Sequence, residues 1–388
     1  MDDSPPSAAS NAGFLVDLAS RSGPDEPAAS GSARHLGLDA LRGVLVAMVV
    51  IGHFPVSAQG HNPFGSLPDW LYFFHIPLFL ALSCLFIKPF TPGRMGRRAV
   101  QILVPYGAWV ILAQPGRLLR QPWGLLRDAA MGNWAHLQSV LWFLPALFST
   151  NLLIALWRRT GLCRPWRRAA GRTALLLPAL AAFLLAPVLA RWHEAIPFGL
   201  DVAVFLLPFI LVMDQVWRQH PRLAAAAGRA LAPAALAALV LGGLCIRVWE
   251  PVKTHSAFAR RVDFAQFSVP VTIPGYLGMV LMAAALLLLA GQLRPPGWLA
   301  ALGRRSMPVY LLHYPLLFAL RHTLGSAGES PASLLVSGLG LLVLVIVLAT
   351  GIAQALMRIS PRFAWIGLGA QARAPVPSLA LREEPSQR

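Results

Sequence analysis

The residues best suited to chemistry lie in an apolar stretch near the start of the sequence. Asp39 and Arg42 are three positions apart, and His53 follows eleven positions after Arg42. In a helix this spacing places Arg42 and His53 on one face, roughly 16 Å apart along the axis. A guanidinium binds anions, and an imidazole acts as a base near neutral pH. The alternative is a structural Asp39–Arg42 ion pair with His53 at an interface.

Two more histidines, His75 and His313, fall inside apolar stretches. Ionisable groups in such stretches usually face the interior of a helix bundle. His75 is a candidate second base or substrate ligand, or else a hydrogen-bonded packing residue. His313 is a candidate functional group, with structural hydrogen bonding to another helix as the alternative. Ser83 receives no role, because membrane serines usually bond to their own helix.

A basic cluster of Arg94, Arg97 and Arg98 precedes a predicted helix start at Ala99. The planar fork of arginine suits phosphate groups, and a helix N-terminus adds a favourable dipole. The alternative is the ordinary enrichment of Lys and Arg in cytoplasmic loops. The three cysteines, Cys84, Cys163 and Cys245, show no metal-ligand spacing. No metal site is therefore predicted.

The composition indicates that a membrane positions these residues. Hydrophobic residues make up 56% of the 388 residues and charged residues only 13%, whereas soluble domains are about 25% charged. The net charge of +17 comes from basic residues between apolar runs, which does not favour nucleic-acid binding. We therefore predict an all-α polytopic membrane protein of about ten transmembrane helices in one bundle. The apolar segments are 36–56, 69–88, 99–114, 136–157, 173–190, 197–214, 223–246, 271–290, 303–322 and 332–357.

Lys and Arg are more frequent in one alternate set of loops than in the other. This bias predicts that both termini are cytoplasmic, although the basic loops 115–135 and 247–270 then lie outside. Residues 1–34 lack apolar periodicity and are predicted to be a disordered cytoplasmic tail. Residues 35–360 form the predicted membrane domain, and 361–388 form a C-terminal cytoplasmic tail.

These segments resemble the integral-membrane acyltransferase family 3, which comprises bacterial O-acyltransferases of surface glycans. The likeness covers roughly residues 34–360. Its matching motifs are Leu38-Asp39-Ala40-Leu41-Arg42-Gly43, the Arg42-to-His53 spacing, His75-Ile76-Pro77-Leu78-Phe79, Leu141-Trp142-Phe143-Leu144-Pro145 and Tyr310-Leu311-Leu312-His313. One departure is Cys84, which stands after Ser83 where the family often has glycine.

The resemblance implies a multi-pass protein of the bacterial inner membrane that transfers an acetyl group from cytoplasmic acetyl-CoA to a carbohydrate hydroxyl. It implies that His53 is catalytic and that Arg42, Arg94, Arg97 and Arg98 are linked to the acyl donor. Acetyl-CoA is expected as a substrate, with no permanently bound cofactor. The expected acceptor is a free or lipid-linked carbohydrate such as exopolysaccharide or lipopolysaccharide. The rival hypothesis is a non-enzymatic carrier or exporter of a lipid-linked or small glycan.

The predicted topology can be tested with reporter fusions at Gly60, Gly93 and Gly161. A reporter that is active only outside the cytoplasm should be active at Gly60 and inactive at Gly93 and Gly161, because the Lys and Arg bias places the last two inside. Activity at Gly161 would contradict the predicted orientation.

Overall fold

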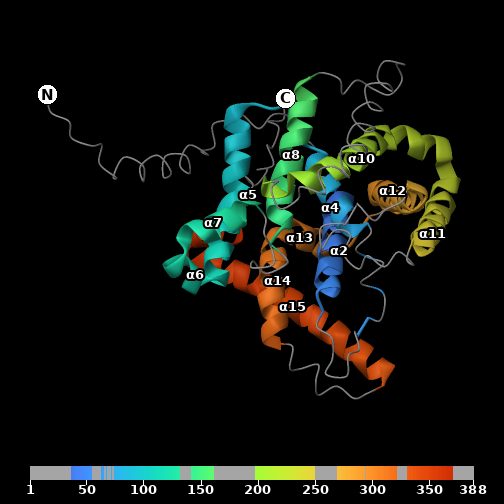
Figure 1. Cartoon of the computed structure of the whole chain (residues 1–388). Coiled ribbons are helices and arrows are strands. Elements are labelled where there is room, and N and C mark those ends of the chain that lie inside the picture. Colours follow the sequence, from blue (N-terminus) through green and yellow to red (C-terminus); the bar gives the residue numbers. More distant parts are fainter. Residues whose placement is uncertain are drawn as a thin grey trace, which may run out of the picture. The chain divides into compact units, whose positions relative to one another are not determined.

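The computed structural model describes residues 36–54, 63–64, 67, 71, 74–131, 141–160, 197–249, 269–292, 294–320 and 330–369. Regular structure in these ranges is entirely helical (Figure 1), which confirms the predicted all-α class. The helices are α2 (Leu36–Gly52), α4 (His75–Cys84), α5 (Pro92–Ala113), α6 (Pro115–Arg120), α7 (Pro122–Met131), α8 (Phe143–Arg159), η2 (Pro197–Gly199), α10 (Leu200–Ala227), η3 (Gly228–Ala230), α11 (Leu231–Trp249), α12 (Val269–Gln292), α13 (Gly297–Arg304), α14 (Ser306–Leu320), α15 (Pro331–Ile359) and α16 (Pro361–Leu368).

Three described helical spans are long and apolar enough to cross a membrane, namely Pro197–Pro221, Gly275–Gln292 and Ser333–Ile359. A crossing needs about 20 residues, and other apolar helices such as α4 (10 residues) are shorter. The predicted segment 173–190 lies outside the described residues. The helices thus support a membrane protein, and the number of ten crossings stays a prediction.

Helix α15 shows the surface expected of a helix in contact with lipid. Its side chains Val336, Val343 and Val347 are each more than half exposed. In water such a stripe would be an apolar patch without a partner, whereas lipid tails cover it without loss of free energy. The outer face of this helix therefore fits a bilayer.

Local sequence signals explain where several helices begin. Proline lacks a backbone N–H and has a fixed φ, so it suits the first helical position. The five described α-helices that begin with proline are α5, α6, α7, α15 and α16. The Ser330 and Ser360 side chains accept hydrogen bonds from the backbone N–H groups of Ser333 and Phe363, and thereby cap α15 and α16.

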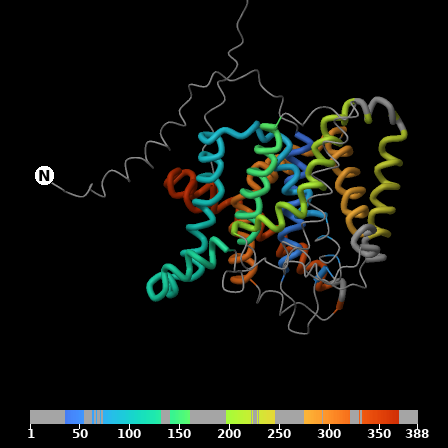
Figure 2. The backbone as a smooth tube through the Cα atoms, turned by 45° about the horizontal axis from the view of Figure 1, so that its top comes forward, coloured from blue at the N-terminus to red at the C-terminus, as the bar shows by residue number. Residues whose placement is uncertain are grey.

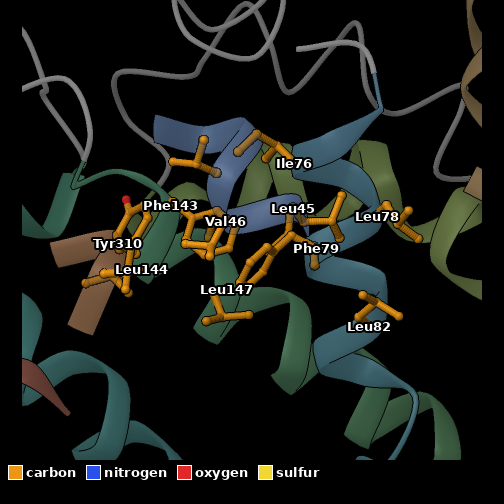
Figure 3. Close-up of a cluster of buried hydrophobic side chains, with 14 of the residues drawn as sticks. Leu45, Val46, Ile76, Leu78, Phe79, Leu82, Phe143, Leu144, Leu147 and Tyr310 are labelled. Atoms are coloured by element: carbon orange, nitrogen blue, oxygen red, sulfur yellow. The ribbon is translucent and has the colours of Figure 1, made fainter. Parts of the chain in front are cut away.

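Helix α2, which carries the candidate residues, packs against α4, α12, α13, α14 and α15. Its residues Leu45 and Val46 are fully buried with Leu78 of α4 and Leu144 of α8. Figure 3 shows this apolar cluster, to which Tyr310 of α14 also belongs. In Figure 2, α11 and α12 lie side by side, and α12 also packs against α2. Burial from several helices thus fixes the position of α2.

Glycine permits the closest approach between α2 and α13. A Cβ atom on Gly303 of α13 would overlap the carbonyl oxygen of Asp39, and one on Gly43 would approach the carbonyl oxygen of Leu299 too closely. Both positions therefore need glycine for packing rather than for backbone conformation. The contact holds the N-terminal half of α2, which includes Arg42, against α13.

The structure has four described helices wholly or mostly where the sequence analysis expects no apolar segment, namely α6, α7, α13 and α16. Helices α6 and α7 occupy the loop 115–135, where Arg117 forms an ion pair with Asp128 at 2.8 Å. This pairing accounts for one of the basic residues that run against the predicted topology. Helix α16 lies in the stretch assigned to the C-terminal tail, and its Gly367 carbonyl accepts a hydrogen bond from Trp109 of α5 at 2.7 Å.

The α2–α13 contact predicts the effect of a single methyl group. Gly303→Ala should lower the free energy of unfolding by about 1–3 kcal/mol, because the added Cβ separates two packed helices. Gly297→Ala in the same helix is the matched control, since no atom lies within 4 Å of the Cβ it adds. Thermal unfolding of the detergent-solubilised protein measures both. Equal stability of the two variants would contradict the packing argument.

Candidate active site

Two of the candidate histidines meet at the C-terminal end of α2. His53 follows the last turn of this helix, and its ring centroid lies 5.2 Å from that of His313 in α14. The Tyr314 ring lies 6.1 Å from His53, edge to face. A charge on His75, at the start of α4, would also act on His53. The structure therefore brings together three histidines that are far apart in the sequence.

The backbone fixes the proton positions of His75 and His313. Both rings are fully buried, and their Nδ1 atoms bond to the carbonyl oxygens of Leu71 and Tyr310. A carbonyl oxygen only accepts, so each Nδ1 carries a hydrogen. In the neutral rings Nε2 is then a hydrogen-bond acceptor. His75 thus has the hydrogen bond that the sequence analysis named as its alternative. His313 bonds to its own helix rather than to another one. The Nε2 atoms of both rings keep the capacity to accept.

Aromatic side chains border the histidines. The Tyr310 ring lies 5.7 Å from His313 and 5.1 Å from Phe143 of α8, between centroids. Phe143 in turn packs edge to face on Phe79 of α4 (Figure 3). Ser83, in the same helix as Phe79, donates to the Phe79 carbonyl oxygen at 2.9 Å. This is the bond to its own helix that left Ser83 without a role.

Arg42 lies at the other end of α2 and already has partners. It donates to the Leu82 carbonyl oxygen at 3.0 Å and lies 3.5 Å from an Asp39 oxygen. Arg304 of α13 lies 3.6 Å from the second oxygen of Asp39. The predicted Asp39–Arg42 pair is thus present and shared with a third group. The Arg42 side chain remains 27% exposed.

The three arginines of α5 have different surroundings. Arg94 and Arg97 are exposed, whereas Arg98 is half-buried. The Arg98 charge interacts with the Arg42 charge, so the two guanidiniums repel each other. The Nε atom of Arg98 is buried and meets no hydrogen-bond acceptor among the described residues. Of the cluster, Arg98 is the member whose charge acts on Arg42.

A buried ion pair near this end was not predicted from the sequence. Arg158 of α8 donates to Asp214 of α10 at 2.7 Å, and their side chains are only 9% and 10% exposed. Arg158 also donates to the carbonyl oxygens of Leu85 and Ile87, just after α4. An acidic residue inside an apolar segment, as Asp214 is, was the available signal.

The departure at Cys84 has a counterpart in the structure. The Cys84 thiol donates to the Asn151 side-chain oxygen at 3.4 Å, and both residues are buried. The side chain thus bonds where the family often has no side chain at all.

Among the described residues no group of three His, Cys, Asp or Glu could hold a metal ion.

Comparison with known proteins gives two similar relatives. Nodulation protein NolL of Mesorhizobium japonicum is 32% identical over 132 residues, which are 31% of this chain and 35% of that protein. Nodulation protein NolL of Sinorhizobium fredii is 27% identical over 159 residues, or 38% of this chain and 43% of that protein. The chain therefore matches less than half the length of these relatives. No solved structure matches.

The family comparison covers nearly the whole helical region. A family model described as an acyltransferase domain, Acyl_transf_3, matches residues 35–358. This range contains the three histidines, the basic cluster and Asp39. It also agrees with the resemblance found in the motifs around Arg42 and His53. The chain therefore belongs to the Acyl_transf_3 family of acyltransferases.

Proposed function

We propose that this protein is a bacterial inner-membrane O-acetyltransferase. It moves an acetyl group from cytoplasmic acetyl-CoA to a hydroxyl of a cell-surface carbohydrate, such as exopolysaccharide or lipopolysaccharide, and both of its termini are cytoplasmic. The observation that carries the proposal is the arrangement along α2. A pair of histidines lies at one end, 5.2 Å apart, and Arg42 lies at the other.

His53 is the proposed general base. The acceptor hydroxyl attacks the thioester carbonyl carbon, its oxygen bonds to that carbon, and its proton moves to His53. The carbon–sulfur bond then breaks, and the CoA sulfur takes the proton from His53. An imidazole suits both steps because it accepts and releases a proton near neutral pH. Transfer through an acyl-His53 intermediate gives the same products.

The arginines are the proposed donor site. Arg94, Arg97 and Arg98 would bind the phosphates of CoA, which match the arginine fork. Arg42 would bind an anionic or carbonyl oxygen deeper along the donor, beside Arg98. The roughly 16 Å between Arg42 and His53 along α2 then corresponds to the thin pantetheine arm, which ends in the thioester. Each end of α2 thus serves one substrate.

The rival function is a carrier or exporter of a lipid-linked or small glycan, which also needs buried histidine and arginine. Membership of an acyltransferase family favours the enzyme. Purified protein, acetyl-CoA labelled in the acetyl group and glycans from cells that lack the gene distinguish the two. The enzyme transfers label to the glycan without a membrane, whereas a carrier leaves the label on CoA.

The first prediction from this mechanism concerns His53. His53→Ala should lower turnover about 10²–10⁴-fold, because a positioned base contributes that much, and larger losses would fit a covalent acyl-His53. Binding of acetyl-CoA should be retained, because the donor contacts lie at the other end of α2. His75→Ala is made in parallel. If only His75→Ala loses turnover, the base is assigned to the wrong residue. If both variants stay active, the mechanism is wrong.

The second prediction concerns the donor. Replacing Arg94, Arg97 and Arg98 together by Ala should weaken acetyl-CoA binding at least tenfold, since each charge-assisted contact contributes about 1.5–3 kcal/mol. Arg98→Ala alone should cause much of this loss of affinity, because solvent screens the two exposed arginines more strongly. The matched control is Arg127→Ala, an exposed arginine of α7. Calorimetric titration measures each affinity, and an unchanged affinity of the triple variant would assign the cluster to topology.

A further inference from the structure

His313 holds an acceptor atom in a fixed direction. Its Nδ1–H donates to the Tyr310 carbonyl oxygen, in the preceding turn of α14. Nδ1 therefore faces the backbone of its own helix. Nε2 is the second nitrogen of the ring, and the ring packs against His53 at the end of α2. Hydrogen bonding to the backbone of α14 thus sets the tautomer of the ring.

This lone pair has no partner within the described part of the chain. The His313 side chain is 0% exposed, and its Nε2 meets no hydrogen-bond donor there. Buried polar atoms are nearly always satisfied, because loss of hydration without a new bond is unfavourable. An acceptor without a donor, 5.2 Å between ring centroids from the proposed base, fits a ligand that brings its own hydrogen.

The surroundings narrow the class of ligand. The Tyr310 ring borders His313, and the Phe143 ring lies next to that of Tyr310. Both rings have flat apolar faces. Arginines gather at the other end of α2, where Arg42 and Arg304 lie beside Asp39. A ligand with O–H donors and apolar C–H faces therefore suits this end better than an anion does. A carbohydrate has both.

We propose that His313 binds the acceptor carbohydrate, with its Nε2 accepting a hydrogen bond from a hydroxyl beside the one that His53 deprotonates. This inference rests on the proposed function and adds a substrate-binding residue to it. His313 then selects hydroxylated acceptors, and it holds the reacting hydroxyl at His53 without itself taking a proton.

Two substitutions separate this role from a structural one. Asn in place of His313 retains a donor for the Tyr310 carbonyl oxygen but has no atom at the position of Nε2. Gln reaches that position with an acceptor oxygen but gives up the bond to Tyr310. The proposal therefore expects that H313N weakens binding of the glycan and that H313Q does not. A structural role expects H313Q to be impaired more than H313N.

The experiment measures acetyl transfer from labelled acetyl-CoA to the glycan fraction of cells that lack the gene. H313N should raise the KM for the glycan about 3–10-fold, as expected for loss of one neutral hydrogen bond. The KM for acetyl-CoA should stay within twofold. H313Q should keep the glycan KM within threefold of the unmodified protein. The matched controls are H220N and H220Q, at a buried histidine whose ring bonds to the Leu288 carbonyl oxygen between α10 and α12. Both should leave the glycan KM unchanged.

The outcomes distinguish the inference from the function beneath it. If the unmodified protein transfers no label, the proposed function fails. If it transfers label and H313N has a normal glycan KM, or H313Q is impaired more than H313N, the inference about His313 is overturned and the enzyme remains. Should H313N not fold, H313Q decides alone. A glycan KM within threefold supports the proposal, and a tenfold rise overturns it.

Discussion

The arrangement of the site depends on how the backbone carbonyl groups at the C-terminal end of α4 are hydrogen-bonded. The last carbonyl groups of a helix have no partners within it, and in an apolar environment each unpaired group is costly. Here Arg42 binds the carbonyl of Leu82, and Arg158 binds those of Leu85 and Ile87. Asp214 holds Arg158 in place from α10. One helix end thus ties α2, α8 and α10 together, and it fixes Arg42 beside the basic start of α5.

The same constraint places the histidines. Helices α2 and α4 run in opposite directions, because the start of α2 meets the end of α4 at Arg42 and Leu82. The end of α2 must then lie near the start of α4, where His53 and His75 interact. Gly303 of α13 and Gly43 of α2 allow these two helices to pack closely, which holds α2 from another side. Arg42 and His53 are therefore held at fixed distance by a rigid helix, which is what a site for two separate substrates requires.

The sequence predicted those parts of the site that depend on local spacing. Asp39 and Arg42 pair because three residues is nearly one helical turn, and the all-α class follows from apolar composition. The approach of His53 to His313 depends on packing between distant helices, which spacing does not encode. Arg158 lies in a basic run that resembles any cytoplasmic loop, so its pairing with Asp214 was not predicted. Helix α4 has 10 residues where a crossing of about 20 was expected. The apolar residues Leu85, Phe86 and Ile87 after it do not continue the helix, and residues 69, 70, 72 and 73 before it lie outside the described part of the chain.

The balance of charge at the Arg42 end gives the last step of the argument. Asp39 is shared by Arg42 and Arg304, and Asp214 is shared by Arg158 and Arg218. Each carboxylate thus compensates only one of its two guanidiniums, and Arg98 adds a further charge close to Arg42. Repulsion among like charges in a partly buried setting is unfavourable until an anion arrives. Phosphate groups of a donor such as acetyl-CoA would relieve it, whereas a neutral glycan would not. The excess of arginine at one end of α2 and the buried histidines at the other therefore support the proposal of a different substrate at each end.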